Sequence, residues 1–258
     1  MNIIKHMDIS NTNITHEKSK SIITDLTDNI EPSKYYLYLI DIHELFNFTN
    51  NNNFSSLICI NGNLTVNGEE ITKYGGFHLH PNVNVAINSK SSSKILIGST
   101  KEINFSDFNF SDKSESKLLP LSTYKVEKPW GFENWYTDNL ENPSYALKRI
   151  HMEEGFQSSL QSHQFKSETN FVVDGKALVL FGIEAPKNTS TKINIEELDK
   201  KIYTPLNGWS NKINELHRVI AHTSYDAIEI STPELDDVIR WQDDNNRISG
   251  RIETEHTS

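Results

Sequence analysis

Cysteine is nearly absent from this 258-residue sequence, and that scarcity sets a first limit on its chemistry. The single cysteine, Cys59, lies in the apolar run SSLICI, so the chain can form no internal disulfide. A cysteine in such a run is expected to be buried and structural rather than reactive. A fold without disulfides suits a reducing compartment, and we expect a cytoplasmic protein.

Long hydrophobic runs and clusters of basic residues are also missing. No apolar stretch approaches bilayer length, and the first residues lack the apolar centre of a signal peptide. The chain has 35 acidic and 25 basic residues, a formal net charge of −10. Because phosphate backbones are bound by clustered Lys and Arg, we expect neither a nucleic acid nor a membrane as partner. A small molecule is the expected ligand.

Short alternating apolar stretches punctuated by turn residues occupy most of the chain. Asn-Gly pairs at 61/62 and 67/68 interrupt this alternation, and such pairs favour tight hairpins because both central residues need positive φ. Many short strands at short spacing indicate an all-β sandwich or barrel. The polar stretch 102–122 divides the strands into two sets, which predicts two tandem barrels.

The predicted organisation therefore has three parts. Residues 1–33 are a polar segment with a short helix expected at 19–30, residues 34–118 form a first barrel, and residues 119–258 form a second barrel with a C-terminal tail. In the first barrel, His78 and His80 are two apart, but no upstream motif supplies further ligands. We expect this barrel to hold no metal.

The stretch GFQSSLQSHQFKSETNFVVDG carries the clearest chemical signal. It contains the pattern G-x5-Q-x-H-x4-E-x6-G, with Gln161, His163 and Glu168 between two glycines. Residues two apart on a strand share a face, and a return strand can bring the glutamate beside them. Imidazole, amide and carboxylate form a mixed N/O donor set suited to Zn²⁺, Fe²⁺, Mn²⁺ or Ni²⁺. His217 is the expected fourth ligand, with His222 as its competitor.

This stretch, together with EKPWGFENW, YALKRIHME, LHRVIA and DDVIRWQDDNNR, resembles the cupin domain of type II phosphomannose isomerases and related sugar cupins. The resemblance covers about Val126 to Arg247. It implies a cupin double-stranded β-helix, or jelly-roll barrel, in a bicupin with a degenerate N-terminal half. It also implies a homodimer and one divalent metal ion, Zn²⁺ first, at the four ligands. Three features depart from the family pattern, since Lys166 replaces an arginine, Asn170 replaces an aromatic residue, and INELH replaces a Pro-x-Gly turn before the second-motif histidine.

The function implied by this resemblance is a metal-dependent isomerase or epimerase of a phosphorylated or nucleotide-linked sugar. Lys148 and Lys166 are the candidate catalytic bases, because burial beside a cation can lower a lysine pKa toward neutrality. Three arginines are candidates for binding the substrate, namely Arg149, Arg218 and Arg240. Two alternatives remain open: a cupin Fe²⁺ dioxygenase, and a sugar-binding cupin without catalytic activity.

Overall fold

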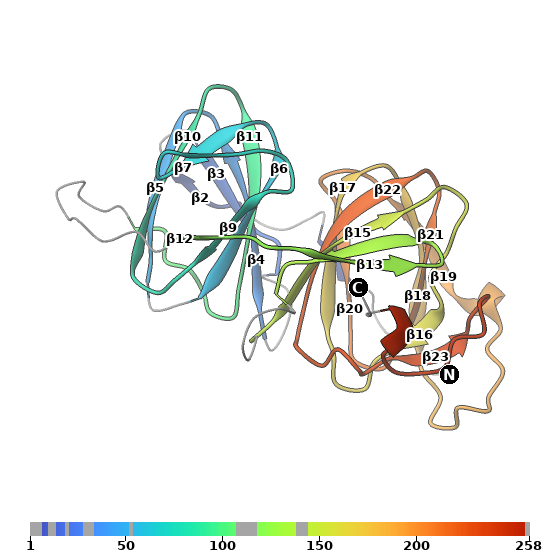
Figure 1. Cartoon of the computed structure of the whole chain (residues 1–258). Coiled ribbons are helices and arrows are strands. Elements are labelled where there is room, and N and C mark those ends of the chain that lie inside the picture. Colours follow the sequence, from blue (N-terminus) through green and yellow to red (C-terminus); the bar gives the residue numbers. More distant parts are fainter. Residues whose placement is uncertain are drawn as a thin grey trace. The chain divides into compact units, whose positions relative to one another are not determined.

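The computed structural model describes residues 7–9, 14–18, 21–27, 34–51, 54–106, 118–137 and 144–255. Antiparallel strands dominate these residues, which confirms the all-β prediction. The two helices found among them are single 3₁₀ turns, Ile195–Glu197 and Glu253–Glu255, so neither could span a bilayer. The chain divides into an N-terminal unit, residues 11–122, and a C-terminal unit, residues 1–10 with 123–258 (Figure 1).

The N-terminal unit is a two-sheet barrel. Its described strands are β2 Ile14–Lys18, β3 Ser21–Asp25, β4 Tyr36–Ile42, β5 Leu45–Asn50, β6 Ser55–Asn61, β7 Leu64–Val66, β8 Glu69–Ile71, β9 Gly76–Leu79, β10 Val83–Ser89, β11 Ser93–Ser99 and β12 Leu118–Pro120. They form sheets in the orders β12-β9-β6-β11-β4-β3-β2 and β5-β10-β7-β8. The prediction of a helix at 19–30 is wrong for the described residues 21–27, because Ser21–Asp25 form β3, which pairs with β4.

Apolar side chains fill the interior of this first barrel. Phe46, Phe48 and Ile97 are fully buried there, in one cluster with aliphatic residues from both sheets. Cys59 belongs to the same cluster, and burial raises the pKa of its thiol to about 11, as expected of a structural cysteine. The interior is therefore a packed core.

The C-terminal unit is a second two-sheet barrel. Its described strands are β1 Met7–Asp8, β13 Tyr124–Lys128, β14 Gly131–Trp135, β15 Ala146–Met152, β16 Leu160–Ser162, β17 Glu168–Asp174, β18 Ala177–Glu184, β19 Asp199–Tyr203, β20 Gly208–Asn211, β21 Glu215–Ala221, β22 Tyr225–Ser231 and β23 Ile239–Gln242. They form sheets in the orders β1-β20-β17-β22-β15-β14-β13 and β19-β18-β21-β16-β23. The described residues of 1–33 thus supply β1 to this unit and β2 and β3 to the other.

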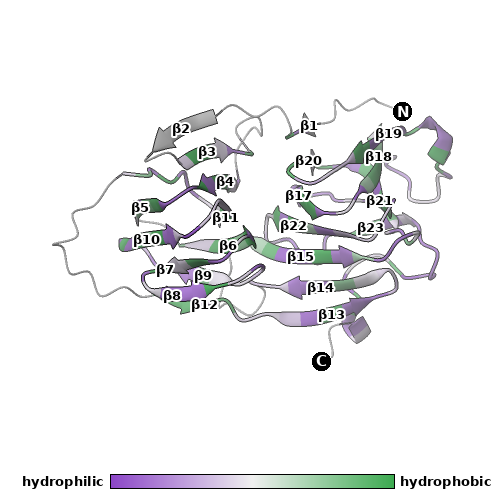
Figure 2. Cartoon of the chain, turned by 90° about the horizontal axis from the view of Figure 1, so that it is seen from above, coloured by the Kyte–Doolittle hydropathy of each residue, from purple (hydrophilic) through white to green (hydrophobic). Residues whose placement is uncertain are grey.

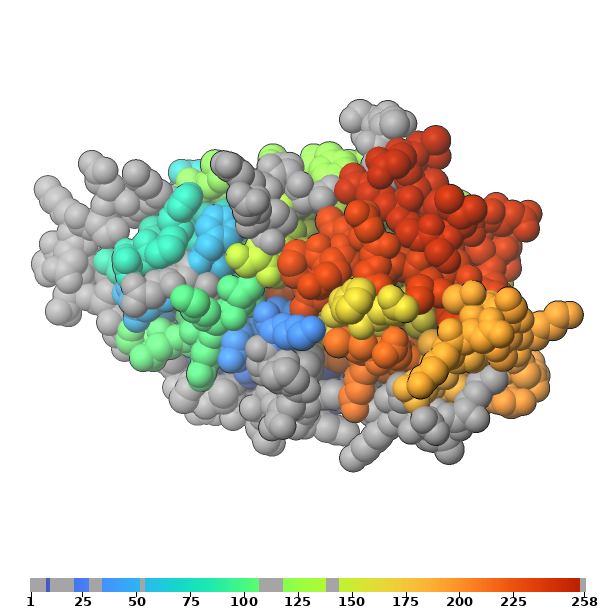
Figure 3. Space-filling model, turned by 90° about the horizontal axis from the view of Figure 1, so that it is seen from below, coloured from blue at the N-terminus to red at the C-terminus, as the bar shows by residue number. Residues whose placement is uncertain are grey.

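Core and cavity divide the interior of the second barrel. Trp209, Val172 and Tyr203 are buried in an apolar cluster, whereas polar side chains line a cavity between the two sheets. Along strands such as β15, hydrophilic and hydrophobic segments alternate (Figure 2). The C-terminal residues, red in Figure 3, gather on one part of the surface of this unit, and β23 within them pairs with β16. Within the expected tail, β23 therefore extends the smaller sheet of the barrel.

The two glycines that bracket the Gln-His-Glu motif differ in their surroundings. Both have positive φ, +80° at Gly155 and +72° at Gly175. A Cβ on Gly155 would meet no atom within 4 Å, whereas one on Gly175 would lie 2.0 Å from the Ser224 carbonyl oxygen.

We predict that Gly155→Ala lowers the free energy of unfolding by about 1 kcal/mol through backbone strain alone. Gly175→Ala should cost about 1–3 kcal/mol more through overpacking. Urea unfolding of both variants checks this, and equal losses would contradict it.

Candidate metal centre

Strand register brings three of the predicted residues to one face of the smaller sheet. Gln161 on β16 lies directly opposite His217 on β21 and opposite Arg240 on β23. Residues directly opposite each other on antiparallel strands share a face, so the three side chains point the same way. Together with His163 and Glu168 they line a cavity of about 120 Å³.

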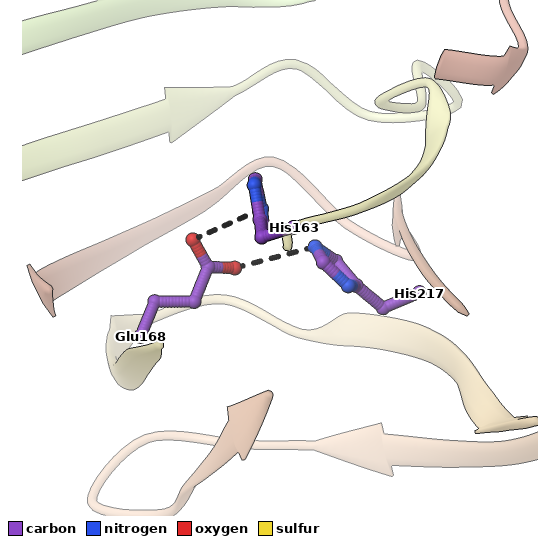
Figure 4. Close-up of side chains that lie close together, drawn as sticks. All are labelled: His163, Glu168 and His217. Carbon is purple, nitrogen blue, oxygen red and sulfur yellow. Dashed lines mark ion pairs between the residues drawn. The ribbon is translucent and has the colours of Figure 1, made fainter. Parts of the chain in front are cut away.

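His163, Glu168 and His217 converge inside this cavity, as Figure 4 shows. Their ligand atoms all lie within 4.8 Å of one another, and each residue is at most 3% exposed. Glu168 Oε1 is 3.3 Å from His217 Nε2, and Glu168 Oε2 is 3.7 Å from His163 Nε2. A buried set of two imidazoles and one carboxylate could hold a divalent metal ion.

Both imidazoles are oriented by backbone carbonyls. His163 Nδ1 donates to the carbonyl of Asp237, and His217 Nδ1 donates to the carbonyl of Glu215 at 3.0 Å. Such bonds place a proton on Nδ1 and turn Nε2 toward the centre, as outer partners of metal-binding histidines do. His163 Nε2 is buried and has no hydrogen-bond partner.

The two histidines titrate in opposite directions. Burial, with the Lys166 charge, lowers the pKa of His163 to about 3, so this ring is neutral. Burial also opposes a charge on His217, but the hydrogen bond and charge of Glu168, together with the Glu215 carbonyl and charge, outweigh burial and raise the pKa of His217. The neutral His163 therefore offers a lone pair at Nε2, whereas at His217 a metal would compete with a proton.

Gln161 borders the three residues through its amide. Its Oε1 accepts from Ser159 Oγ at 3.0 Å, and its Nε2 lies 3.2 Å from His217 Nε2. A half-turn of the amide exchanges oxygen and nitrogen and would present an oxygen ligand. His222, the competitor of His217, is exposed beyond the end of β21 and does not line the cavity.

The two lysines predicted as catalytic both point into the cavity, where carboxylates surround them. Lys166 pairs with Glu168 and, at 3.0 Å, with Glu229. Lys148 pairs with Glu133 at 2.9 Å and with Glu229 at 3.3 Å. The result is a continuous row of alternating charges that begins at a candidate metal ligand.

These pairings correct the expectation of a lowered lysine pKa. Burial lowers the pKa of Lys148 and of Lys166, but the adjacent carboxylates outweigh burial and raise both. Burial likewise raises the pKa of Glu133, yet Lys148 and Lys128 overcome it and hold that pKa at about 2. Both lysines are therefore ammonium ions, which donate protons rather than accept them.

Only one of the three predicted arginines reaches the cavity. Arg149 follows Lys148 on β15, so it faces the opposite side of the sheet, where its Nε donates to Asp226 at 2.8 Å. Arg218 follows His217 on β21 in the same way and donates to the Gln242 carbonyl at 3.0 Å. Neither lines the cavity, because strand alternation turns both side chains to the opposite face of their sheets. Arg240 does line it.

Sequence reasoning missed three residues of the site. Glu133 and Glu229 hold the lysines, and Asp237 holds His163. The sequence contained one indication of Glu229, which stands in the apolar strand YDAIEIS two residues after buried Ala227. An acid at an inward position of such a strand requires a buried partner.

The histidines of the first barrel play a different part. His78 is buried, its Nδ1 lies 2.8 Å from Ser56 Oγ, and its ring stacks on Phe54. In the described part of the N-terminal unit, no group of three His, Cys, Asp or Glu residues is placed to hold a metal.

Comparison with known proteins identifies the fold. No protein-family model matches the sequence, and no curated protein is found to be similar to it. Among solved structures, Bacillus subtilis oxalate decarboxylase with Mn(II) centres is similar at a TM-score of 0.65 and 11% identity, over 93% of this chain and 80% of its own. Lactobacillus farciminis oxalate decarboxylase in complex with formate is similar at a TM-score of 0.64 and 10% identity, over 93% of this chain and 90% of its own. The chain therefore has the two-barrel cupin fold, while the specific likeness to phosphomannose isomerases receives no support from these comparisons.

Proposed function

We propose that the C-terminal unit binds one divalent metal ion through His163, Glu168 and His217, with Gln161 as the fourth ligand. The observation that carries this proposal is the unpartnered Nε2 of His163, buried beside Glu168. A buried polar atom without a partner costs about 1–3 kcal/mol, and a metal ion would remove that cost. The donor set suits Zn²⁺, our first choice, and also Mn²⁺ or Fe²⁺.

The proposed reaction is isomerisation or epimerisation of a small hydroxy-carbonyl compound with an anionic group, such as a sugar phosphate. Among the described cations of the cavity, five have carboxylate partners, namely Lys128, Lys148, Lys166, Arg247 and Arg251, whereas Arg240 makes no ion pair. The Arg240 guanidinium donates through NH1 to the carbonyl of Ile248 and, at 2.7 Å, to the carbonyl of Gly250, and its Nε has no partner. A phosphate or carboxylate group of the substrate would satisfy it.

The remaining polar groups divide the chemistry. A bound metal ion would supply Lewis acidity to the substrate carbonyl. The Lys148 ammonium would stabilise negative charge that develops on the substrate oxygen, since its charge is held in place by Glu133 and Glu229. Glu229, which lines the cavity beside Lys148, is the proposed proton acceptor in place of the lysines.

A sugar-binding cupin without turnover is the second candidate. It is favoured by the ion pairs themselves, because both lysines are neutralised by carboxylates and Glu229 is held by two ammonium groups. Ligand binding without proton exchange distinguishes this candidate from an isomerase.

The metal proposal predicts that each chain binds one metal ion and that loss of a ligand weakens this binding. Protein purified without added metal should contain about one divalent ion per chain by mass spectrometry. His163→Ala and His217→Ala should each lower the metal affinity at least about 100-fold, because each removes a ligand nitrogen. His222→Ala is the matched control and should retain the metal, since His222 lies outside the cavity. Wild-type protein that binds no ion would refute the proposal.

The substrate proposal predicts hydrogen exchange at carbon. In D₂O, mannose 6-phosphate, fructose 6-phosphate or a sugar nucleotide should gain deuterium beside its carbonyl or latent carbonyl, observed by NMR. Arg240→Gln should raise KM about tenfold or more and leave the metal content unchanged, because it removes the unpaired cation. Arg149→Gln changes the same residue type on the outer face and should leave KM unaltered. Binding without exchange would favour the second candidate.

The row of buried charges predicts a large stability effect. Lys148→Met leaves Glu133 and Glu229 short of a counterion, so the free energy of unfolding should fall by about 3–5 kcal/mol. Lys148→Met combined with Glu133→Gln should recover part of that loss in urea unfolding. Lys176→Met, at an exposed lysine, should change stability by less than about 0.5 kcal/mol. A Lys148→Met variant as stable as wild type would contradict these ion pairs.

A further inference from the structure

Asp237 contacts four consecutive residues, the proposed metal ligand His163 and the three residues that follow it. Its carboxylate accepts hydrogen bonds from the backbone N–H groups of Gln164, Phe165 and Lys166, at 3.0, 2.6 and 2.8 Å. Its carbonyl oxygen accepts the bond from His163 Nδ1. One residue, 74 positions further along the chain than His163, thus holds the whole start of the segment that joins β16 to β17.

Other contacts hold the two ends of this segment. The Asn214 N–H donates to the His163 carbonyl at 2.6 Å at one end, and at the other end the Ser167 N–H donates to Thr232 Oγ1 at 3.2 Å. Between these ends Phe165 is 63% exposed, so its side chain does not anchor the turn in the core. Three successive N–H groups that converge on one carboxylate form an anion-binding turn. The Asp237 carboxylate is therefore the contact that gathers the three N–H groups that follow His163.

We infer that Asp237 is a positioning residue, which sets the ring orientation and tautomer of His163 for metal binding. The carbonyl accepts the Nδ1 proton, and the carboxylate keeps the turn at the place where that bond can form. Asp237 does not line the cavity, so it acts through His163 rather than on the metal or substrate. This inference rests on the proposed metal site.

The contributions of the two Asp237 oxygen groups can be separated by substitution. Every variant keeps the backbone carbonyl, so Asp237→Ala removes only the three contacts of the side chain. Asp237→Asn keeps one acceptor oxygen but turns an NH₂ group toward N–H donors, and its effect should be intermediate. Asp236 is a matched control, because it is the same residue type, adjacent and exposed, and none of the described side-chain bonds involves it.

Metal affinity is the first readout. Competition with a chromophoric chelator for Zn²⁺ should give Asp237→Ala an affinity about 10–100-fold below wild type, the usual cost of losing an outer partner of a ligand. Asp237→Asn should fall between the two, and Asp236→Ala should stay within about twofold of wild type. If Asp237 only supported the fold, the folded fraction of Asp237→Ala would bind Zn²⁺ as wild type does, and the inference would fail.

The tautomer of His163 in metal-free protein is the second readout. Nitrogen-15 NMR of the imidazoles should show His163 protonated on Nδ1 in wild type and in Asp236→Ala, and a mixture of tautomers in Asp237→Ala. If Asp237→Ala does not fold, Asp237→Asn carries both measurements. Two results together would refute the metal proposal and still leave Asp237 as the residue that orients His163. These results are that wild type binds no Zn²⁺ and that Asp237→Ala nevertheless shows the mixture of tautomers. An unchanged tautomer would overturn the inference.

Discussion

The burial of charged side chains is the constraint on which the site in the second barrel depends. Moving an ion from water into a protein interior costs several kcal/mol unless a partner of opposite charge is buried beside it. The site meets this constraint with a row of alternating charges, in the order Glu168, Lys166, Glu229, Lys148, Glu133, Lys128 and Glu255. The row starts at a candidate ligand and ends in the C-terminal segment, so the ligand carboxylate and that segment belong to one electrostatic system.

The first barrel fills its interior mainly with apolar side chains rather than with ion pairs. It repeats the arrangement of two antiparallel sheets, yet its interior is filled by side chains such as Phe46, Phe48 and Ile97. Buried His78 lies 2.8 Å from the Ser56 hydroxyl there, through its Nδ1. Two barrels of one fold thus hold an apolar core and a charged cavity within a single chain. The cupin fold alone therefore says little about chemistry, which resides in the side chains at inward positions.

The local part of the site could be predicted from the sequence, and the long-range part could not. The spacing of Gln161, His163 and Glu168 followed from the two-residue period of a strand and a return strand. The phase of β15 did not, because alternation places either Lys148 or Arg149 inside and the sequence does not say which. The acidic partners of Lys148 lie on β14 and β22, and only strand register brings them together. At residues 19–30 a local helical pattern was misleading, since pairing with β4 outweighed it.

Apolar residues beside the Lys148-Arg149 pair set that phase. Each of the two basic residues has a carboxylate on β22, Glu229 inside the barrel and Asp226 outside. A slip of β15 by one residue would turn Arg149 inward and Lys148 outward, because side chains alternate between faces. Each carboxylate would still face a cation, and Glu229 would keep Lys166, so the ion pairs alone do not exclude the slip. The slip would turn buried Ile150 and Met152 to the outer face and His151 inward, so the apolar residues of β15 select the strand pairing on which the buried ion pairs depend.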